Sequence, residues 1–199
     1  MSLTFQPFPF ELSGLAEWVV ETAKREITVA REPADISIIE PLPAYYADAR
    51  RFILEGPEAA TRTGWRTIVL ASDQPISLLD IGLSRAGEPQ YATRDGASAV
   101  ALEQALLMAA RAGSREDYEV RWLSLADIYV TTVWLEGEKQ LFIPTRLGGA
   151  ERVEAKILNL SELQELVDRL VRKQVDSSPQ ESARRQWSAR SPTSGLPPE

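Results

Sequence analysis

Carboxylates and a few lysines are the residues of this chain best able to do chemistry, because it contains neither histidine nor cysteine. The clearest constellation is Glu154-Ala155-Lys156, an ExK motif on an expected strand, with Asp127 upstream. Two carboxylates can hold Mg²⁺ while a nearby lysine stabilises charge or activates water. One interpretation is therefore a carboxylate-dependent Mg²⁺ hydrolase or nuclease that uses Asp127, Glu154 and Lys156.

The same motif also has a purely structural interpretation. Glu154 and Lys156 are two residues apart, so on a strand they share one face and can simply be solvated neighbours. An ExK triplet arises by chance in many chains of this length, and an acidic protein is poorly suited to a DNA substrate. The hydrolase is therefore the less favoured interpretation.

Asp80 interrupts an apolar run, and such a carboxylate can be a ligand or an acid/base group. The simpler alternative is that Leu79, Ile81 and Leu83 face the core while Asp80 faces outward, and we favour it. A wider acidic group at strand ends could also converge: Asp73, Asp80, Asp95 and Asp127.

The missing residue types exclude several chemistries. Without histidine there is no Ser-His-Asp triad and no histidine-ligated zinc, and without cysteine there is no thiolate nucleophile or disulfide. The phosphate-binding, dinucleotide-binding and serine-hydrolase motifs are also absent. We therefore assign no catalytic residue and expect no cofactor and no metal.

The charge of the chain argues against two classes of partner. Its 199 residues carry a net charge of −7, and only the segment after Leu170 is slightly basic. An acidic body disfavours nucleic acid and anionic membrane surfaces. The first residues lack a basic leader pattern and no apolar run is long enough to span a bilayer, so we expect a cytoplasmic location. The preference for arginine over lysine suggests a bacterial source.

Composition divides the chain into three parts. Residues 1–12 predict an extended N-terminal arm, because Pro7 and Pro9 disfavour a helix there. Residues 13–174 predict a single α+β domain. Residues 175–199 are rich in Ser, Pro, Gln and Arg and predict a disordered tail.

The helical segments are expected at four places. One follows Ser13, although residues 27–38 could form a hairpin or a longer helix. A second follows Pro41 and Pro43, carries Tyr45 and Phe52 on one face, and ends at Gly56-Pro57. A third covers 99–112, is capped by Ser98, and is apolar around most of its circumference, which indicates burial. A fourth is opened by a capping box, Ser161 to Gln164.

Alternating or short apolar runs predict strands at 65–71, 76–84, 90–93, 118–124, 128–135, 139–144 and 152–158. The fold class expected from this order is α+β, with a mainly antiparallel sheet of about five to seven strands packed against helices and a disordered C-terminal tail. Three tryptophans occupy periodic apolar positions and are expected in the core: Trp18, Trp122 and Trp134.

Trp187 differs from these tryptophans because it lies in the tail beside Arg184 and Arg185. Arg184, Arg185 and Trp187 could form a short motif that folds onto a partner. A solvated tail, or a tail that touches its own acidic body, are the alternatives.

The interpretation we favour is a non-catalytic protein-binding adaptor, immunity-type or assembly component. It is supported by the missing catalytic residue types, the acidic body and the aromatic content of both ends of the chain. A third class is a small-molecule sensor with a pocket between the 99–112 helix and the sheet.

Overall fold

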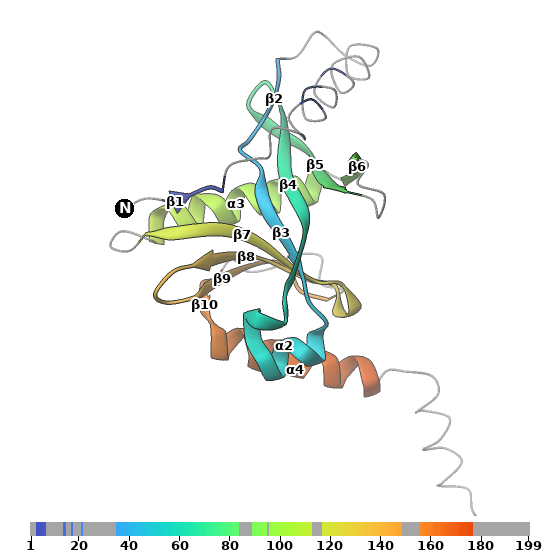
Figure 1. The fold of residues 1–199 in the computed structure, drawn as a ribbon, viewed down its shortest axis with the longest axis vertical. Coiled ribbons are helices and arrows are strands. Elements are labelled where there is room, and N and C mark those ends of the chain that lie inside the picture. Colours follow the sequence, from blue (N-terminus) through green and yellow to red (C-terminus); the bar gives the residue numbers. More distant parts are fainter. Residues whose placement is uncertain are drawn as a thin grey trace, which may run out of the picture.

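The computed structural model describes residues 3–6, 14, 17, 21, 35–83, 89–94, 96–112, 117–148 and 156–176. Within these ranges the strands form one mixed sheet of ten strands in the order β10-β9-β8-β7-β3-β4-β5-β6, with β1 beside β7 and β2 beside β4 (Figure 1). No helix in these ranges has the length and hydropathy that a membrane crossing requires.

The described elements run as follows. The strands are β1 (Leu3–Thr4), β2 (Ile36–Ile38), β3 (Leu42–Tyr46), β4 (Thr61–Ala71), β5 (Gln74–Leu83), β6 (Pro89–Arg94), β7 (Tyr118–Leu125), β8 (Val130–Glu136), β9 (Leu141–Arg146) and β10 (Leu158–Asn159). The helices are α2 (Ala49–Glu55), α3 (Gly96–Ala112) and α4 (Leu160–Asp176), with 3-10 turns at Gly56–Ala59 and Ala126–Ile128.

The strands expected at 65–71, 76–84, 90–93, 118–124, 128–135 and 139–144 are present as β4, β5, β6, β7, β8 and β9. β4 and β5 pair antiparallel through a tight turn in which Ser72 and Asp73 have φ values of 48° and 61°. Positive φ at both central residues matches the twist of a two-residue hairpin. β5–β6, β7–β8 and β8–β9 are also antiparallel neighbours.

The sheet is larger than expected and mixed, because two pairings along β7 are parallel. β3 lies beside β7 with Ala44 opposite Trp122, and β1 lies beside β7 with Leu3 opposite Tyr118. These pairs join distant parts of the sequence, so no local pattern reports them. The expected α+β class and mainly antiparallel pairing are therefore present, but the sheet is mixed and has more strands than the five to seven expected.

The segment from Pro41 to Tyr46 was expected to begin a helix, and it is strand β3 instead. A proline forces its preceding residue towards extended backbone, which suits a strand. The helix begins only after Asp48, whose side chain accepts a hydrogen bond from the Arg51 N–H at 3.0 Å. The predicted end is confirmed: Gly56 is the C-cap, with φ 65°.

Helix α3 packs across one face of the sheet, and its buried side joins the first core. It was expected to be buried almost all round, but its outer side exposes Val100 and Leu107, at 38% and 51%. Ser98 lies inside the helix rather than at its cap, because the helix already begins at Gly96. The first core contains Leu42, Ile68, Leu78, Leu102, Tyr118, Val120, Trp122, Val133, Leu135 and Ile143, with α3 alanines between them.

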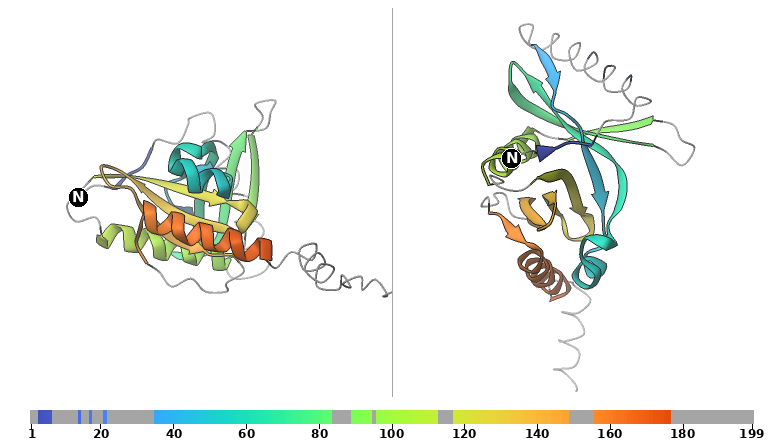
Figure 2. Two further views of the ribbon diagram at one scale, coloured as in Figure 1. Left: turned by 90° about the horizontal axis from the view of Figure 1, so that it is seen from below. Right: turned by 60° about the vertical axis from the view of Figure 1, so that its left-hand side comes forward.

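Helices α2 and α4 lie together on the opposite face, so the sheet is the middle layer (Figure 2). Their core includes Phe52, Leu163, Val167, Trp134 and Phe142, and the last two rings stack with centroids 6.2 Å apart. Trp122 and Trp134 are both buried, as expected. Trp18 lies outside the described residues.

The start of α4 is capped two residues earlier than expected. Asn159 Oδ1 accepts from the Glu162 N–H at 3.0 Å, and Glu162 Oε2 accepts from the Asn159 N–H at 2.9 Å. This reciprocal pair is the capping box, in place of Ser161 and Gln164. Gln164 instead donates to the backbone oxygens of two α2 residues, Phe52 at 3.3 Å and Ile53 at 3.1 Å.

Some sequence expectations lie outside the described residues. These are residues 7–12 of the N-terminal arm, residues 152–155 of the last expected strand and residues 177–199 of the expected tail. Of the arm, β1 joins the sheet and Phe5 packs partly buried against the first core.

Candidate functional site

An open pocket of about 440 Å³ lies on the sheet where β3, β4, β5, β6 and β7 run side by side. No residue of α3 lines it. α3 covers only part of this face, where large side chains such as Leu42 and Ile68 project. This is therefore not the pocket that the small-molecule-sensor interpretation places between the 99–112 helix and the sheet.

The hollow exists because small residues come together on neighbouring strands. Ala44 pairs with Gly64, and Asp80 pairs with Ala92 next to Gly82. Gly64 has a structural reason to be glycine: a Cβ built there would lie 2.2 Å from the backbone oxygen of Ile81, and its φ is +155°. Because β4 and β5 approach each other so closely at Gly64, no side chain fits there, and the bare backbone at this position forms part of the pocket floor.

Charged residues cross the pocket as a ladder of alternating sign. Arg66 on β4 pairs with Asp80 on β5 through Nε and Oδ1, and the two residues are direct register partners. Arg94 on β6 donates from Nε to the other oxygen of Asp80 at 2.8 Å. The side chains are 9%, 24% and 54% exposed for Arg66, Asp80 and Arg94 respectively, so the ladder runs from the interior out to the sheet edge.

The Asp80 carboxyl stays ionised because of these two partners. Burial by itself would raise its pKa, but the hydrogen bonds and positive charges of Arg66 and Arg94 outweigh burial and leave the pKa below its ordinary value. A carboxylate held this way is a poor general acid or base at neutral pH.

Aromatic rings form much of the remaining wall. The Arg66 guanidinium lies 4.4 Å from the centre of the Trp122 ring, a cation–π contact. Tyr46 also lines the pocket and is 40% exposed. Within the described part of the chain, the buried Trp122 Nε1 meets no hydrogen-bond acceptor.

The pocket residues suit binding better than bond chemistry. Two guanidiniums and one carboxylate are committed to each other, and the other polar side chains are hydroxyls and an amide. No protein-family model, curated protein or solved structure matches this chain. Function must therefore be argued from the chain's own geometry.

The structure describes two of the three residues of the hydrolase interpretation, Asp127 and Lys156. Asp127 Oδ2 accepts from the Ala49 N–H at 3.1 Å, so it supports the start of α2. Lys156 is exposed, and Glu154 lies outside the described residues. Of the wider acidic group, Asp73 lies in the β4–β5 turn and Asp95 is outside the described ranges. Within those ranges no three acidic side chains form a group able to hold a metal ion.

The sequence predicts that Leu79, Ile81 and Leu83 face the core while Asp80 faces outward. Leu79 and Ile81 are buried as expected, but Leu78 is buried too. Both faces of β5 are therefore covered near Leu78, and Asp80 points into the partly buried pocket. The tail residues Arg184, Arg185 and Trp187 lie outside the described residues.

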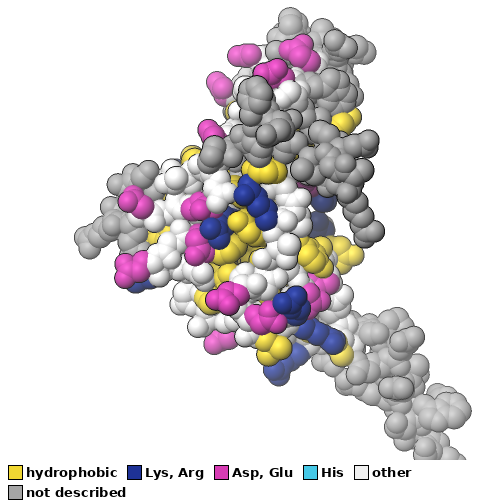
Figure 3. Space-filling model, in the orientation of Figure 1, with side chains coloured by type: hydrophobic (Ala, Val, Ile, Leu, Met, Phe, Trp, Pro, Cys, Tyr) yellow, Lys and Arg dark blue, Asp and Glu magenta, His cyan; other side chains and the backbone are white. Residues whose placement is uncertain are grey.

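A second charged cluster lies on the opposite face of the sheet. The Arg121 guanidinium sits 4.6 Å from the Trp134 ring centre and 5.3 Å from that of Tyr45. Its Nε donates to Glu119 at 2.6 Å, and Glu136 lies 3.5 Å from its Nη1. The hydrogen bond from Arg121 lowers the pKa of the Glu119 carboxyl. Figure 3 shows charges of both signs side by side around hydrophobic side chains on one face of the molecule.

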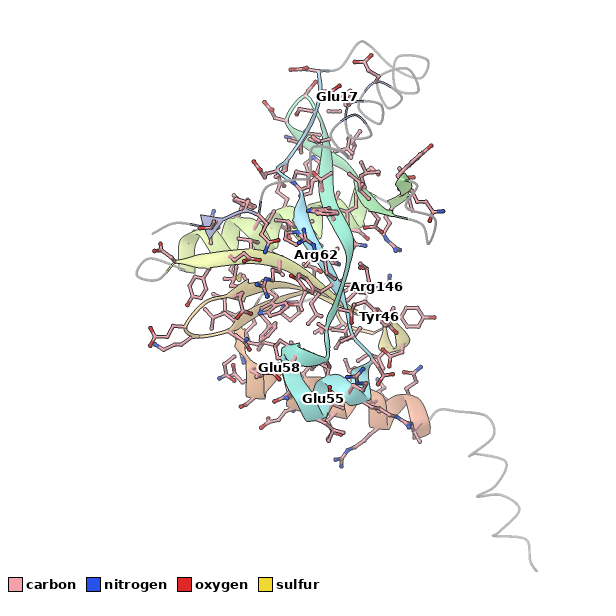
Figure 4. All side chains as sticks on the ribbon, viewed as in Figure 1. Glu17, Tyr46, Glu55, Glu58, Arg62 and Arg146 are labelled. Carbon is pink, nitrogen blue, oxygen red and sulfur yellow. The ribbon has the colours of Figure 1, made fainter. Side chains whose placement is uncertain are left out.

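This second cluster ties the segment after β1 to strands β4 and β7. Gln6, just after β1, donates to Glu119 at 2.7 Å and accepts from Arg62 at 2.9 Å. Arg62, labelled near the middle of the molecule in Figure 4, also lies 4.3 Å from the Trp65 ring centre. Every charge in the cluster has a partner within the protein, so its evident role is to fix the N-terminal strand.

Sequence reasoning missed Arg66 and Arg94 as site residues. The available signal was that Arg66 and Asp80 each interrupt an apolar run in adjacent strands of one hairpin. When residues are counted outward along both strands from the turn at Ser72 and Asp73, Arg66 and Asp80 fall at positions that differ by one residue. A simple hairpin therefore predicts that the two lie close together across the strands. Arg94 and Trp122 gave no comparable signal.

Proposed function

We propose that this protein is a non-catalytic binding protein that recognises another protein through the pocket beside β6. The observation that carries the proposal is the Arg66–Asp80–Arg94 ladder, because its charges are committed to one another and leave the pocket without a free acid, base or nucleophile–base pair. Such a site can select and hold a partner without making or breaking bonds.

The composition of the pocket supports a protein partner. Tyrosine, tryptophan and arginine are enriched at the centres of protein interfaces, where each buries a large area while keeping a polar group. Tyr46 and Arg94 combine this chemistry with exposure. A pocket of 440 Å³ is large enough for one or two side chains of a bound segment.

The charge of the chain supports a protein rather than nucleic acid as the partner. A net charge of −7 opposes approach to a phosphate backbone. We place the protein in the cytoplasm of a bacterium, where a chain without cysteine loses nothing to the reducing conditions. An adaptor or assembly component fits these features.

The test uses the full chain as bait for a displayed library of random linear peptides. We expect enriched peptides to bind the purified protein and to lose about tenfold or more in affinity for the Tyr46→Ala variant. Tyr129→Ala is the matched control, because Tyr129 is 60% exposed but does not line the pocket. If no peptide is enriched, or if enriched peptides bind the Tyr46→Ala variant as tightly as the wild type, the proposal is wrong.

A further inference from the structure

Strand β6 is the open end of the sheet in the described part of the chain. It pairs with β5 on one side and is the last strand in the order, so no described strand lies on its other side. Its residues from Gln90 to Arg94 are all exposed. The opposite end of the sheet is only two residues long and continues directly into α4. An edge strand of this length, with no described strand beside it, can offer backbone N–H and C=O groups to another strand.

The register places alternate β6 side chains over the pocket. Ala92 pairs with Asp80, and Gln90 with Gly82, so the side chains of these β6 residues and of Arg94 lie on the pocket face. Tyr91 and Thr93 belong to the other face of the sheet. A strand added to β6 would likewise send every second side chain towards the pocket.

The charge ladder ends at this same edge with a positive group. Two guanidiniums share one carboxylate, and among the described residues Asp80 is the only acidic one that lines the pocket. Arg94 uses Nε for Asp80, its side chain is 54% exposed, and it lies on the outermost strand. Positive, negative and positive charges thus alternate over β4, β5 and β6, and among the described residues no negative group takes the next position outward.

We propose that β6 receives an extended segment of a partner protein as an added strand, and that a Glu or Asp of that segment pairs with Arg94. This inference rests on the proposed function. Directly opposite residues of paired strands have Cβ atoms about 5 Å apart, so an acidic side chain opposite or diagonal to Arg94 is in reach. Arg66 lies two strands further in, about 10 Å away at ordinary strand spacing, so it acts only by holding Asp80.

A second copy of this chain is a poor occupant of the edge. Residues Pro89–Arg94 contain no carboxylate, so pairing β6 with another β6 would bring an arginine and no acid to the site. Charge complementarity therefore favours a different protein with an acidic extended segment.

The test measures affinities of the enriched peptides after each acidic residue is changed to its amide. We expect one such change to weaken binding to the wild type about five- to twentyfold, and Arg94→Gln to weaken it by a similar factor. The two changes together should cost little more than either alone, because they remove the same pair. Arg111→Gln, an exposed arginine on α3, is the matched control and should leave the affinity unchanged.

A backbone variant tests strand addition separately. Successive residues of a strand point their N–H groups to opposite sides, so one of Ala92→Pro and Thr93→Pro removes an outward N–H and spares the pairing with β5. We expect that variant to keep the wild-type melting temperature and to lose peptide binding about tenfold or more.

Four outcomes would overturn the inference. Peptides that bind at Tyr46 but whose affinity is unchanged by Arg94→Gln and by both proline variants would leave the proposed function standing and remove the added strand. Competition of the peptides by millimolar acetate or inorganic phosphate alone would identify a free anion as the occupant. A wild-type dimer that either proline variant dissociates would identify a second copy. Failure to enrich any peptide removes the proposed function together with the inference.

Discussion

The guanidinium of Arg66 lies 4.4 Å from the ring centre of Trp122, so the charged pocket and the core under α3 share a wall. Trp122 is 3% exposed, and the Arg66 side chain is 9% exposed. A charge this far from water is stable only while its partner is present. Changes at Asp80 should therefore be felt in the core as well as in the pocket.

Asp80→Asn should lower the free energy of unfolding by about 2 kcal/mol, because it leaves the buried Arg66 without a counter-charge. Urea unfolding at neutral pH measures the effect. Asp73→Asn is the control: Asp73 is exposed in the hairpin turn at φ 61°, a conformation that asparagine tolerates well, so its stability should be unchanged. Equal losses in the two variants would contradict the role given to the ladder.

The acid side of the stability curve should depend on Asp80. Because the folded-state pKa of its carboxyl lies below the unfolded value, its contribution is complete above about pH 4 and is lost as pH falls through the folded pKa. Wild type should therefore lose stability below about pH 4 more steeply than Asp80→Asn. Thermal melts between neutral pH and pH 2 make the comparison, and parallel curves would show that Asp80 is not ion-paired.

Gly64→Ala should destabilise the fold by about 3 kcal/mol or more, because the new Cβ would meet the Ile81 carbonyl oxygen at 2.2 Å and the backbone has positive φ. Gly82→Ala makes a graded comparison. Its Cβ would lie 3.2 Å from the Thr63 oxygen, which a small shift can relieve, so the loss should be well under half as large. Chemical denaturation of both variants measures the difference, and a neutral Gly64→Ala would mean that β4 and β5 do not approach so closely.

Asn159→Ala should cost about 1 kcal/mol of stability, because it removes the side chain that caps α4. Ser161→Ala is the matched control and should be within a few tenths of a kcal/mol of wild type. If Ser161→Ala lowered the stability more than Asn159→Ala did, the capping box would be the one expected from the sequence, Ser161 to Gln164.

Magnesium or manganese chloride at about 5 mM should leave the melting temperature unchanged, since a metal that binds only the folded state would raise it. The reason is that Asp127 already accepts a hydrogen bond from α2, and no acidic group of three forms among the described residues. A rise of several degrees that Asp127→Asn or Glu154→Gln abolishes would support the hydrolase interpretation instead.

The local patterns of the sequence predicted the hairpins well. β4–β5 and β8–β9 are joined by short turns, so alternation and turn residues determine them within one window. The strand β3 was missed because its partner, β7, is far along the chain, and nothing near Tyr45 records that pairing.

The pocket was missed for a related reason. Its floor is the meeting of Ala44, Gly64, Gly82 and Ala92 from four strands, and small residues carry no chemical signature of their own. Asp80 was recognised as unusual, but its meaning depended on Arg66 and Arg94 on either side. The pairing of β4 with β5 within one hairpin could have identified Arg66 as the partner of Asp80. Arg94 could be identified only from the arrangement of β4, β5 and β6.

The parallel pairing of β3 with β7 also determines the order in which the protein can be built on the ribosome. Ala44 leaves the exit tunnel long before Trp122, so the centre of the sheet stays incomplete until most of the described chain has emerged. Until then β3 lacks its neighbour β7, and the β4–β5 hairpin is the part of this sheet that can form from local contacts. The open edge of β3 is therefore available to other chains while the residues between Tyr46 and Tyr118 are being made.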